Sequence, residues 1–154
     1  MQINILQIGK TKHSFIKEAE AEYLKRLTRF GEINNLILKE GRVQNNPQVT
    51  REDEAKLLLQ NIPKHSFKIA LDEKGKQFSS VELARLIGEN KDFGEASLTF
   101  LIGGPYGLDE SVKQKADLIL SFSKFTFTHE MIRMLLLEQL YRSFTILTNK
   151  TYHF

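Results

Sequence analysis

Residues 98–127 decide how this chain folds, because they hold two short apolar runs separated by a glycine cluster. The stretch begins Leu98-Thr-Phe-Leu-Ile-Gly-Gly-Pro-Tyr-Gly107 and ends Ala116-Asp-Leu-Ile-Leu-Ser-Phe-Ser-Lys-Phe-Thr-Phe127. Each run has the length of a buried strand and ends in small or polar residues. Ligands of α/β folds bind at the carboxyl ends of parallel strands, so the stretch predicts a cofactor site. An ordinary Rossmann domain has its glycine loop after the first strand, whereas this one lies in the last third of the chain.

The composition indicates one ordinary globular domain. The chain has 154 residues, a net charge of +3 and a sequence pI of about 9.1. This mild positive charge permits binding to a polyanion without requiring it. The absence of cysteine excludes disulfides and thiolate metal sites, and the four histidines do not have zinc-ligand spacing. We therefore expect no metal.

The ends and apolar runs of the chain give no sign of a membrane protein. The opening residues lack the basic region and the small-residue cleavage site of a signal peptide. No apolar run approaches the roughly 20 residues that span a bilayer. We therefore expect a cytoplasmic protein with no membrane partner.

Strand-like and helical patterns alternate along the whole chain. Thr50 and Asp109 are expected to cap helices, and Ser79 with Glu82 forms a capping box. The alternation predicts an α/β fold: a single domain, with a mostly parallel sheet flanked by helices. Strands are expected at 2–8, 33–39, 67–71, 97–102 and 117–121, with a last strand-like run at 143–148; helices at 14–29, 50–60, 79–89, 110–116 and 129–141; and a polar loop at 41–49.

The cluster Gly103-Gly104-Pro105-Tyr106-Gly107 ends the fourth expected strand. Glycine lets the backbone turn sharply and lets a ligand approach main-chain N–H groups. The spacing matches neither the G-x-G-x-x-G fingerprint nor a P-loop. A ligand-binding loop and a simple tight turn are both open interpretations.

The segment Phe122-Ser-Lys-Phe-Thr-Phe127 follows the fifth expected strand and has three aromatic residues in six positions. Such residues can wall an adenine pocket while backbone groups bind the edge of the base. The alternative is that the phenylalanines belong to the core. The neighbouring glycine cluster favours the binding site.

The helix expected at 129–141 is apolar on nearly every face, interrupted by Arg133, Glu138 and Gln139. A helix of this kind must be covered on all sides. Because a small domain rarely covers one completely, the pattern favours a homodimer interface, and twofold dimers are the commonest oligomers. A central core helix is the alternative.

The chain ends in Thr151-Tyr152-His153-Phe154, although chain ends are usually polar and frayed. An aromatic end suggests docking at a site, where His153 could act as a general base near neutral pH. An inert terminal histidine is the alternative.

Basic residues follow two of the expected strands. Lys10, Lys12 and His13 come after the first strand, and Lys74 and Lys76 come after the third. A parallel sheet places them at the same edge as the glycine cluster, where they could contact RNA phosphates without reading sequence. Ordinary solvated lysines are the alternative.

Together, these motifs resemble the ribosomal large-subunit methyltransferase H family of the SPOUT superfamily. The resemblance covers the whole chain and rests on the order and spacing of the motifs, since each one alone is weak. The motifs are Ile3-Asn-Ile-Leu-Gln-Ile-Gly-Lys10, Leu71-Asp-Glu-Lys-Gly-Lys76, Leu101-Ile-Gly-Gly-Pro-Tyr-Gly-Leu108, Leu120-Ser-Phe-Ser-Lys-Phe-Thr-Phe127, His129, Leu137-Glu-Gln-Leu-Tyr-Arg142 and Tyr152-His153.

The resemblance implies a fold that the residue patterns alone could not show. The C-terminal segment would pass through a loop to make a trefoil knot, which is very rare among proteins. One methyltransferase domain would span residues 1–154, with the cofactor-binding knot within about 98–154. The chain would form an obligate homodimer, with each S-adenosylmethionine site near the partner's chain end.

The same resemblance implies the site residues and the reaction. The cofactor contacts carried over are Leu71, Gly103, Phe122, Ser123, Lys124, Phe125, Thr126 and Phe127. The reaction would be methylation of N3 of a pseudouridine, in the 23S rRNA hairpin that faces the decoding site.

Three residues near the end of the chain are the expected catalytic group. The N3 proton must leave before or during methyl transfer, and we expect His153 of the partner to assist that step. Tyr152 and Arg142 would position the base or a phosphate. A small protein with few basic residues should bind naked RNA weakly, so the expected substrate is 23S rRNA within the assembled ribosome.

The sequence departs from the family pattern at two positions. Thr128 stands where relatives often have proline before the histidine, and threonine can cap the helix equally well. Phe154 stands where relatives often have a basic residue, so the phosphate contact that a basic residue could make is not expected of this chain.

Three other functions fit parts of the sequence. A non-enzymatic ribosome-binding module would bind no cofactor. A flavodoxin-like protein would bind a nucleotide or flavin near Gly9, but that turn has few glycines and hydroxyls. A usual glycine-loop methyltransferase would need its glycine loop after the first strand and an acidic ribose ligand after the second, for which Glu40 is a faint match.

Overall fold

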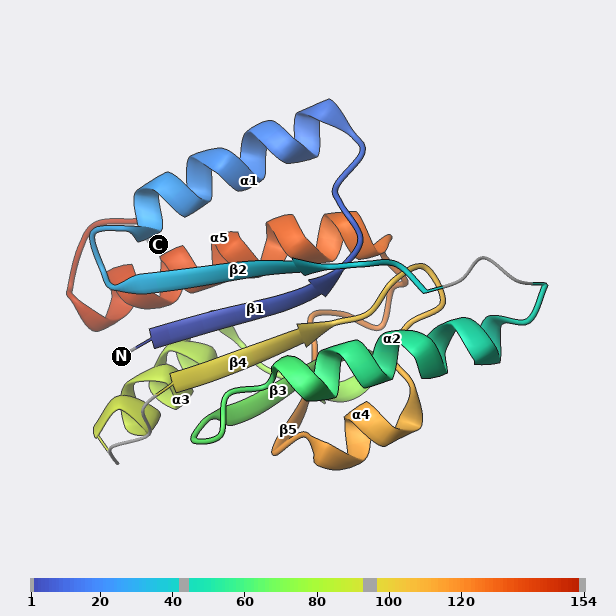
Figure 1. The fold of residues 1–154 in the computed structure, drawn as a ribbon. Helices are drawn as coiled ribbons and strands as arrows, with labels where there is room; N and C mark the ends of the chain where they lie inside the picture. The colour runs from blue at the N-terminus through green and yellow to red at the C-terminus, as the bar shows by residue number, and fades with distance from the viewer. Residues whose placement is uncertain (1, 42–44, 93–96, 153–154) are drawn as a thin grey trace.

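A five-stranded parallel sheet organises the chain in the computed structural model, which describes residues 2–41, 45–92 and 97–152 (Figure 1). The strand order is β2-β1-β4-β3-β5, and every pairing is parallel. The elements are β1 (Gln2–Ile8), α1 (Ser14–Leu27), β2 (Glu32–Leu38), α2 (Pro47–Asn61), β3 (Phe67–Gln77), α3 (Ser80–Asp92), β4 (Ser97–Ile102), α4 (Glu110–Lys115), β5 (Leu118–Ser121) and α5 (His129–Leu147).

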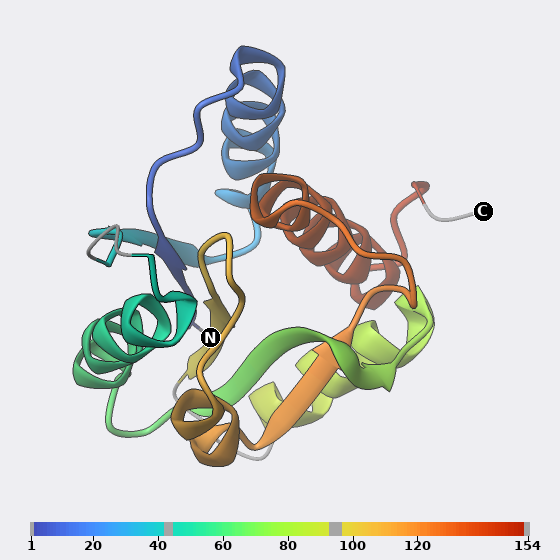
Figure 2. The same cartoon turned by 90° about the vertical axis from the view of Figure 1, so that its right-hand side faces the viewer.

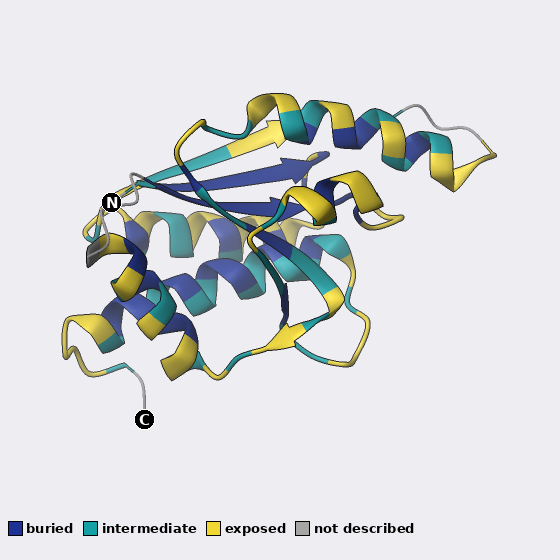
Figure 3. Cartoon of the chain, turned by 90° about the horizontal axis from the view of Figure 1, so that it is seen from below, coloured by how far each residue is buried: buried dark blue, intermediate teal, exposed yellow. Residues whose placement is uncertain are grey.

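Helices cover both faces of the sheet. Helices α1, α3 and α5 lie on one face and α2 and α4 on the other (Figure 2). Each face has its own apolar cluster: Phe100 and Leu140 belong to the first, and Leu101 and Leu58 to the second. The central strands are accordingly buried, while the outward sides of the helices are exposed (Figure 3). The expected single α/β domain with a parallel sheet is confirmed, and the trefoil knot stays a prediction.

Helix α2 begins earlier than expected. Thr50 does not cap it; Asn46 does, by accepting a hydrogen bond from the Gln48 N–H at 3.0 Å. Pro47 occupies the first helical position, where its fixed φ suits a helix and its missing N–H costs nothing. The Asn-Pro pair that predicted a loop is therefore the start signal of the helix. The capping box of Ser79 and Glu82 and the Asp109 cap are confirmed.

Strand β3 is longer than the predicted 67–71, because it resumes pairing with β5 after a bulge between Leu71 and Lys76. Gly75 permits this close approach. A Cβ there would lie 2.6 Å from the carbonyl oxygen of Ile119. The bulge moves residues 72–75 out of the ladder and toward the edge where the site lies.

The expected strand-like run at 143–148 is wrong, since α5 continues through it to Leu147. Its β-branched residues favour a strand, but Leu140, Ser143 and Phe144 are buried at helical spacing. Phe144 also stacks on Phe30 with ring centroids 5.3 Å apart. Tertiary packing therefore overrides local propensity. No helix in the described ranges is long and apolar enough to cross a membrane.

Truncating Leu140 to alanine should lower the free energy of unfolding by about 2–5 kcal/mol, because its fully buried side chain would leave a cavity in the core. Urea unfolding at one fixed protein concentration measures this loss. Val81→Ala is the matched control, because Val81 is 44% exposed on α3 and should change the free energy by less than about 0.5 kcal/mol. Equal losses in the two variants would contradict the assignment of α5 to the core.

Candidate functional site

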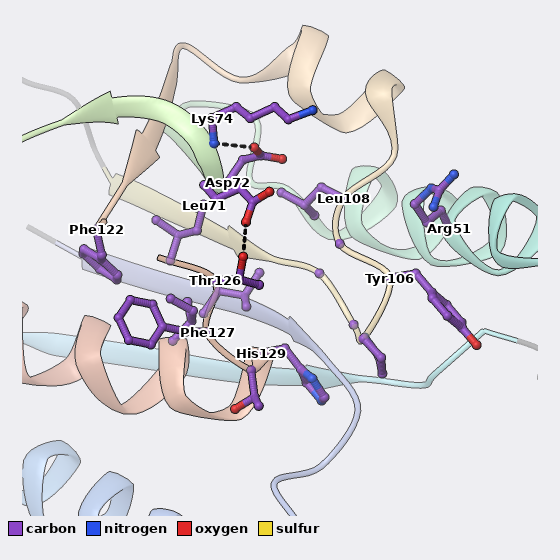
Figure 4. A pocket seen from close by; sticks show the side chains of 18 of the residues that line it. Arg51, Leu71, Asp72, Lys74, Tyr106, Leu108, Phe122, Thr126, Phe127 and His129 are labelled. Atoms are coloured by element: carbon purple, nitrogen blue, oxygen red, sulfur yellow. Dashed lines mark hydrogen bonds between the residues drawn. The ribbon is translucent and has the colours of Figure 1, made fainter. Parts of the chain in front are cut away.

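A cavity of about 870 Å³ lies at the carboxyl ends of the strands. This is the edge at which α/β sheets bind ligands. Its walls include the bulge of β3, the loop after β4, the segment that joins β5 to α5, and the first turns of α2 (Figure 4). The loop after β1 and helices α4 and α5 complete the lining. The volume suits a ligand of nucleotide size.

One wall of the cavity is apolar. Leu71, Phe122 and Phe127 lie together there, and Ile102 and Leu120 add to the same lining (Figure 4). Leu71 ends the first part of β3, and Phe122 follows β5 directly. Neighbouring strand ends thus place an aliphatic and two aromatic side chains around one space, which suits the faces of a flat heterocycle.

The glycine loop forms a second wall and needs glycine for steric reasons. A Cβ at Gly103 would lie 2.6 Å from the backbone carbonyl of Gly107, which excludes any side chain. Gly107 has a φ of 79° and donates its N–H to the Gly104 carbonyl at 3.0 Å. The tight-turn and ligand-loop interpretations are therefore compatible, because the turn itself forms part of the cavity.

A buried carboxylate supports this loop from behind. Glu54 of α2 is 2% exposed and accepts a hydrogen bond from the Gly41 N–H at 3.2 Å. Burial raises the pKa of Glu54, and hydrogen bonds from the N–H groups of Gly41 and Gly104 partly oppose that rise. Glu54 therefore ties the glycine loop to α2 and to the loop after β2.

Polar contacts hold the other walls together. Lys113 of α4 forms ion pairs with Asp72 at 3.4 Å and Glu110 at 3.3 Å. Burial would lower the pKa of Lys113, but Glu110 and Asp72 outweigh it and raise the pKa. The Thr126 hydroxyl donates to Glu73 at 2.8 Å, which links the segment after β5 to the β3 bulge.

The start of α5 is fixed to the loop after β1. Glu130 accepts hydrogen bonds from the backbone N–H of Lys12 at 3.1 Å and of His13 at 3.2 Å, and its carboxylate pairs with the His13 ring at 2.8 Å. Burial raises the pKa of Glu130, but these hydrogen bonds outweigh it and lower the pKa to about 2. Glu130 is therefore ionised throughout the neutral range.

His129 lines the cavity at the first position of α5 (Figure 4). Burial and the nearby Arg133 guanidinium lower the pKa of His129 below its usual 6.5. Its imidazole is therefore largely neutral at neutral pH. Within the described ranges, no group of three or more His, Asp or Glu side chains could hold a metal ion.

The cavity brings together most residues expected to bind the cofactor. Lys124 lies in the same segment but is exposed and not part of the lining. The predicted cofactor residues in the lining are Leu71, Gly103, Phe122, Ser123, Phe125, Thr126 and Phe127. Sequence reasoning assigned no cofactor contact to Arg51, Asp72, His129 or Glu130, which also line the cavity. Arg51 and Glu130 lie in no motif, and only the folded chain brings them to this edge.

Two of the expected catalytic residues, Arg142 and Tyr152, lie away from the cavity of their own chain. Arg142 follows His129 by 13 positions along α5, which corresponds to about 20 Å at 1.5 Å per residue. Figure 1 shows the end of α5 and the segment that follows it at the opposite end of the sheet from the cavity. His153 lies outside the described residues.

Arg142 and Tyr152 lie together at that far end. Arg142 pairs with Glu138 at 2.6 Å, and its guanidinium lies 4.8 Å from the centre of the Tyr152 ring. Tyr152 packs edge-on against Tyr141, and its hydroxyl lies 3.4 Å from the hydroxyl of Tyr23. Burial and the Tyr23 contact raise the pKa of Tyr152 to about 12. Tyr152 is therefore a neutral hydrogen-bonding group rather than a base at neutral pH.

Comparison with known proteins agrees with this architecture. Residues 1–153 match the family described as "Predicted SPOUT methyltransferase". The chain belongs to the SPOUT methyltransferase family. Two curated relatives are both named "Ribosomal RNA large subunit methyltransferase H". The protein from Desulfotalea psychrophila is 46% identical over 153 residues, and the one from Halothermothrix orenii is 43% identical over 158; each match covers 99% of both chains.

Solved structures support the fold of this family member. A probable methylase family protein from Haemophilus influenzae superposes with a TM-score of 0.60 at 16% identity, covering 99% of this chain and 70% of that one. A probable methyltransferase from Bordetella pertussis gives a TM-score of 0.61 at 13% identity, covering 92% and 93%. At these identities the likeness concerns the fold alone.

Glu130→Gln should make the free energy of unfolding less dependent on pH. The pKa of Glu130 is about 2 in the folded protein and about 4.5 in the unfolded chain. Its ionised form therefore stabilises the fold above about pH 5, and this contribution is lost as the pH falls toward 2. We expect the variant to lose roughly 1–2 kcal/mol at pH 7, since His13 is largely exposed, and nothing near pH 2. Urea unfolding at several pH values measures this difference. A constant difference between the two proteins from pH 7 to pH 2 would contradict the charge interaction.

Proposed function

We propose that this protein is an S-adenosylmethionine-dependent methyltransferase that modifies N3 of a pseudouridine in 23S rRNA. The observation that carries the proposal is the cavity formed by the glycine loop and the Phe122–Phe127 segment at the carboxyl edge of the sheet. The full-length similarity to proteins named as large-subunit rRNA methyltransferases supports the choice of RNA.

The residues of the cavity fit S-adenosylmethionine. Leu71, Phe122 and Phe127 would pack against the adenine, and main-chain groups of the glycine loop and of the Phe122–Phe127 segment would bind its polar edges. The turn that brings this loop to the cavity requires glycine at position 103, because a Cβ there would clash with the backbone of Gly107. When bound, this cofactor supplies an electrophilic methyl group.

The protein's own task is alignment of the nucleotide and removal of one proton. Holding the N3 atom in line with the methyl group accounts for most of the acceleration expected of such a site. His153 is proposed to accept the N3 proton, with Tyr152 hydrogen-bonding to the base and Arg142 binding the base or a phosphate. The raised pKa of Tyr152 supports its role as a neutral donor.

A homodimer is proposed because Arg142 and Tyr152 do not reach the cavity of their own chain. Arg142 and Tyr152 lie toward the opposite end of α5 from the cavity. One face of α5 packs into the core through Leu136 and Leu140, as the core-helix alternative expects. Met134 and Leu135 remain half-buried on α5, and this surface could pack against a second copy. An antiparallel twofold pairing of α5 would bring each tail toward the partner's cavity.

The proposed setting is the assembled ribosome in the cytoplasm, because a net charge of +3 provides little affinity for naked RNA. The proposal also includes one domain over residues 1–154 and a trefoil knot in its C-terminal part. The proposed cofactor site also includes Leu71, Asp72 and Arg51, which line the cavity from β3 and α2.

Methyl transfer from labelled S-adenosylmethionine tests the proposal directly. We expect label on 70S particles from a strain that lacks the modification, much less on deproteinised rRNA, and N3-methylpseudouridine as the product in mass spectrometry. Cofactor binding without transfer would point to another RNA substrate. If S-adenosylmethionine does not bind at all, the protein is better explained as a non-enzymatic ribosome-binding module.

Mixing two inactive variants tests whether the site is shared between subunits. Gly103→Ala should abolish cofactor binding, because its Cβ cannot fit beside Gly107, and Tyr152→Ala should remove a catalytic contact. Random pairing of the two co-expressed chains should restore about a quarter of wild-type activity, because half the dimers contain one intact site of two. Gly103→Ala mixed with a chain carrying both substitutions is the control and should stay inactive. No recovery in the first mixture would place the site within one chain.

A further inference from the structure

Exposed aromatic rings gather at the mouth of the cavity. Seven large apolar side chains are exposed in the described part of the chain, and three of them are aromatic: Phe15 at 63%, Tyr106 at 48% and Phe125 at 79%. Tyr106 and Phe125 line the cavity. The Phe15 ring lies 5.7 Å from the ring of His13, which lines the same cavity. We call Phe15, Tyr106 and Phe125 the aromatic rim.

The grouping of these rings points to a binding role. Single exposed apolar residues are normal on protein surfaces and need no explanation. Here, however, every exposed aromatic ring of the set is beside one opening. The four exposed aliphatic residues lie elsewhere: Leu36 and Ile37 on β2, Val81 on α3 and Leu147 at the end of α5. A set of exposed rings around a pocket marks an interaction site.

Two of the rings stand on well-anchored backbone: Phe15 in the first turn of α1 and Phe125 in the segment after β5. The backbone N–H groups of Lys12 and His13, which precede α1, donate to the Glu130 carboxylate at 3.1 and 3.2 Å. The N–H of Phe125 donates to the Ser123 hydroxyl at 3.0 Å, and the next residue, Thr126, is bonded to Glu73. These anchors hold both rings outward before any partner arrives, which lowers the entropy cost of binding.

The charges beside the rim suit a nucleic acid. The Lys12 side chain is 75% exposed, and its ammonium group lies 3.9 Å from Glu40, a weak contact at the surface. Lys10 is also exposed in the loop that leads into α1, and Lys124 is exposed next to Phe125. Separate rings with lysines between them resemble the surfaces that bind single strands, on which bases stack while cations follow the backbone.

We propose that the aromatic rim stacks against unpaired RNA bases next to the nucleotide that is methylated. The proposal rests on the proposed function and adds the form in which the RNA must arrive. A double helix hides the faces of its bases, so only an unstacked loop can use these rings. Phe15, Tyr106 and Phe125 act as positioning residues, because they touch neighbouring bases and not the reacting atoms.

Substitutions at Phe15 separate stacking from folding. Phe15→Ala should raise the KM for 70S particles about tenfold, the effect expected for one lost base stack, and should leave S-adenosylmethionine affinity unchanged. Phe15→Trp should keep the KM close to wild type, because indole also stacks. Val81→Ala, another exposed apolar truncation, is the control and should change neither value. An unchanged KM in Phe15→Ala, or a raised KM in Phe15→Trp, would overturn the proposal.

A photo-crosslink identifies the partner without relying on activity. Phe15→p-benzoylphenylalanine, irradiated with 70S particles, should cross-link to rRNA. Cross-linking to a ribosomal protein or to a second copy of this chain would show that Phe15 serves a protein interface and overturn the proposal. If wild-type protein transfers no methyl group but position 15 still cross-links to RNA, the proposed function fails while the aromatic rim remains an RNA-binding surface.

Discussion

The buried guanidinium of Arg133 fixes α5 against the sheet, and the site depends on that attachment. Arg133 is 1% exposed and donates to the carbonyl oxygen of Ile8, at the end of β1, and to the Thr11 hydroxyl at 3.2 Å. Thr11 in turn donates to Glu20 at 3.1 Å. Burial lowers the pKa of Arg133, and nearby carboxylates, first that of Glu20, oppose the shift. A buried charge without such partners would destabilise the fold strongly. The first turns of α5 must therefore lie where Arg133 can reach Ile8 and Thr11.

The placement of α5 determines two further features. Its first residues follow the Phe122–Phe127 segment directly, so fixing them also fixes one wall of the cavity. Its length then carries Arg142 about 20 Å away from that wall. A rigid helix of this length cannot bring both of its ends to one point. The helix that fixes one wall of the cavity therefore also places Arg142 and Tyr152 out of reach of that cavity, which is why the proposed function needs a second copy of the chain.

The sequence predicted well those elements whose formation depends on residues close together in the chain. Apolar runs such as 97–102 became strands, and the caps at Ser79 and Asp109 form because each depends on residues within one turn. Predictions failed where distant packing decides: α5 continues past Tyr141 because Phe144 stacks on Phe30, and β3 continues because it can pair again with β5. The missed residues of the site have the same explanation, since Glu130 and His13 are separated by 117 positions and meet only in the folded chain.

The charge of the cavity follows from these long-range contacts and bears on the proposed cofactor. His129 is kept largely neutral by burial and by Arg133, so it adds little positive charge to the lining. Glu130 stays ionised because its pKa is lowered to about 2. The lining holds five carboxylates against three Lys or Arg side chains: Asp72, Glu73, Asp109, Glu110 and Glu130 against Arg51, Lys74 and Lys113. A space of this kind favours a cation over a neutral molecule of the same shape. S-adenosylmethionine carries a sulfonium charge that is lost on methyl transfer, so the same carboxylates that favour binding of the donor would no longer hold its product.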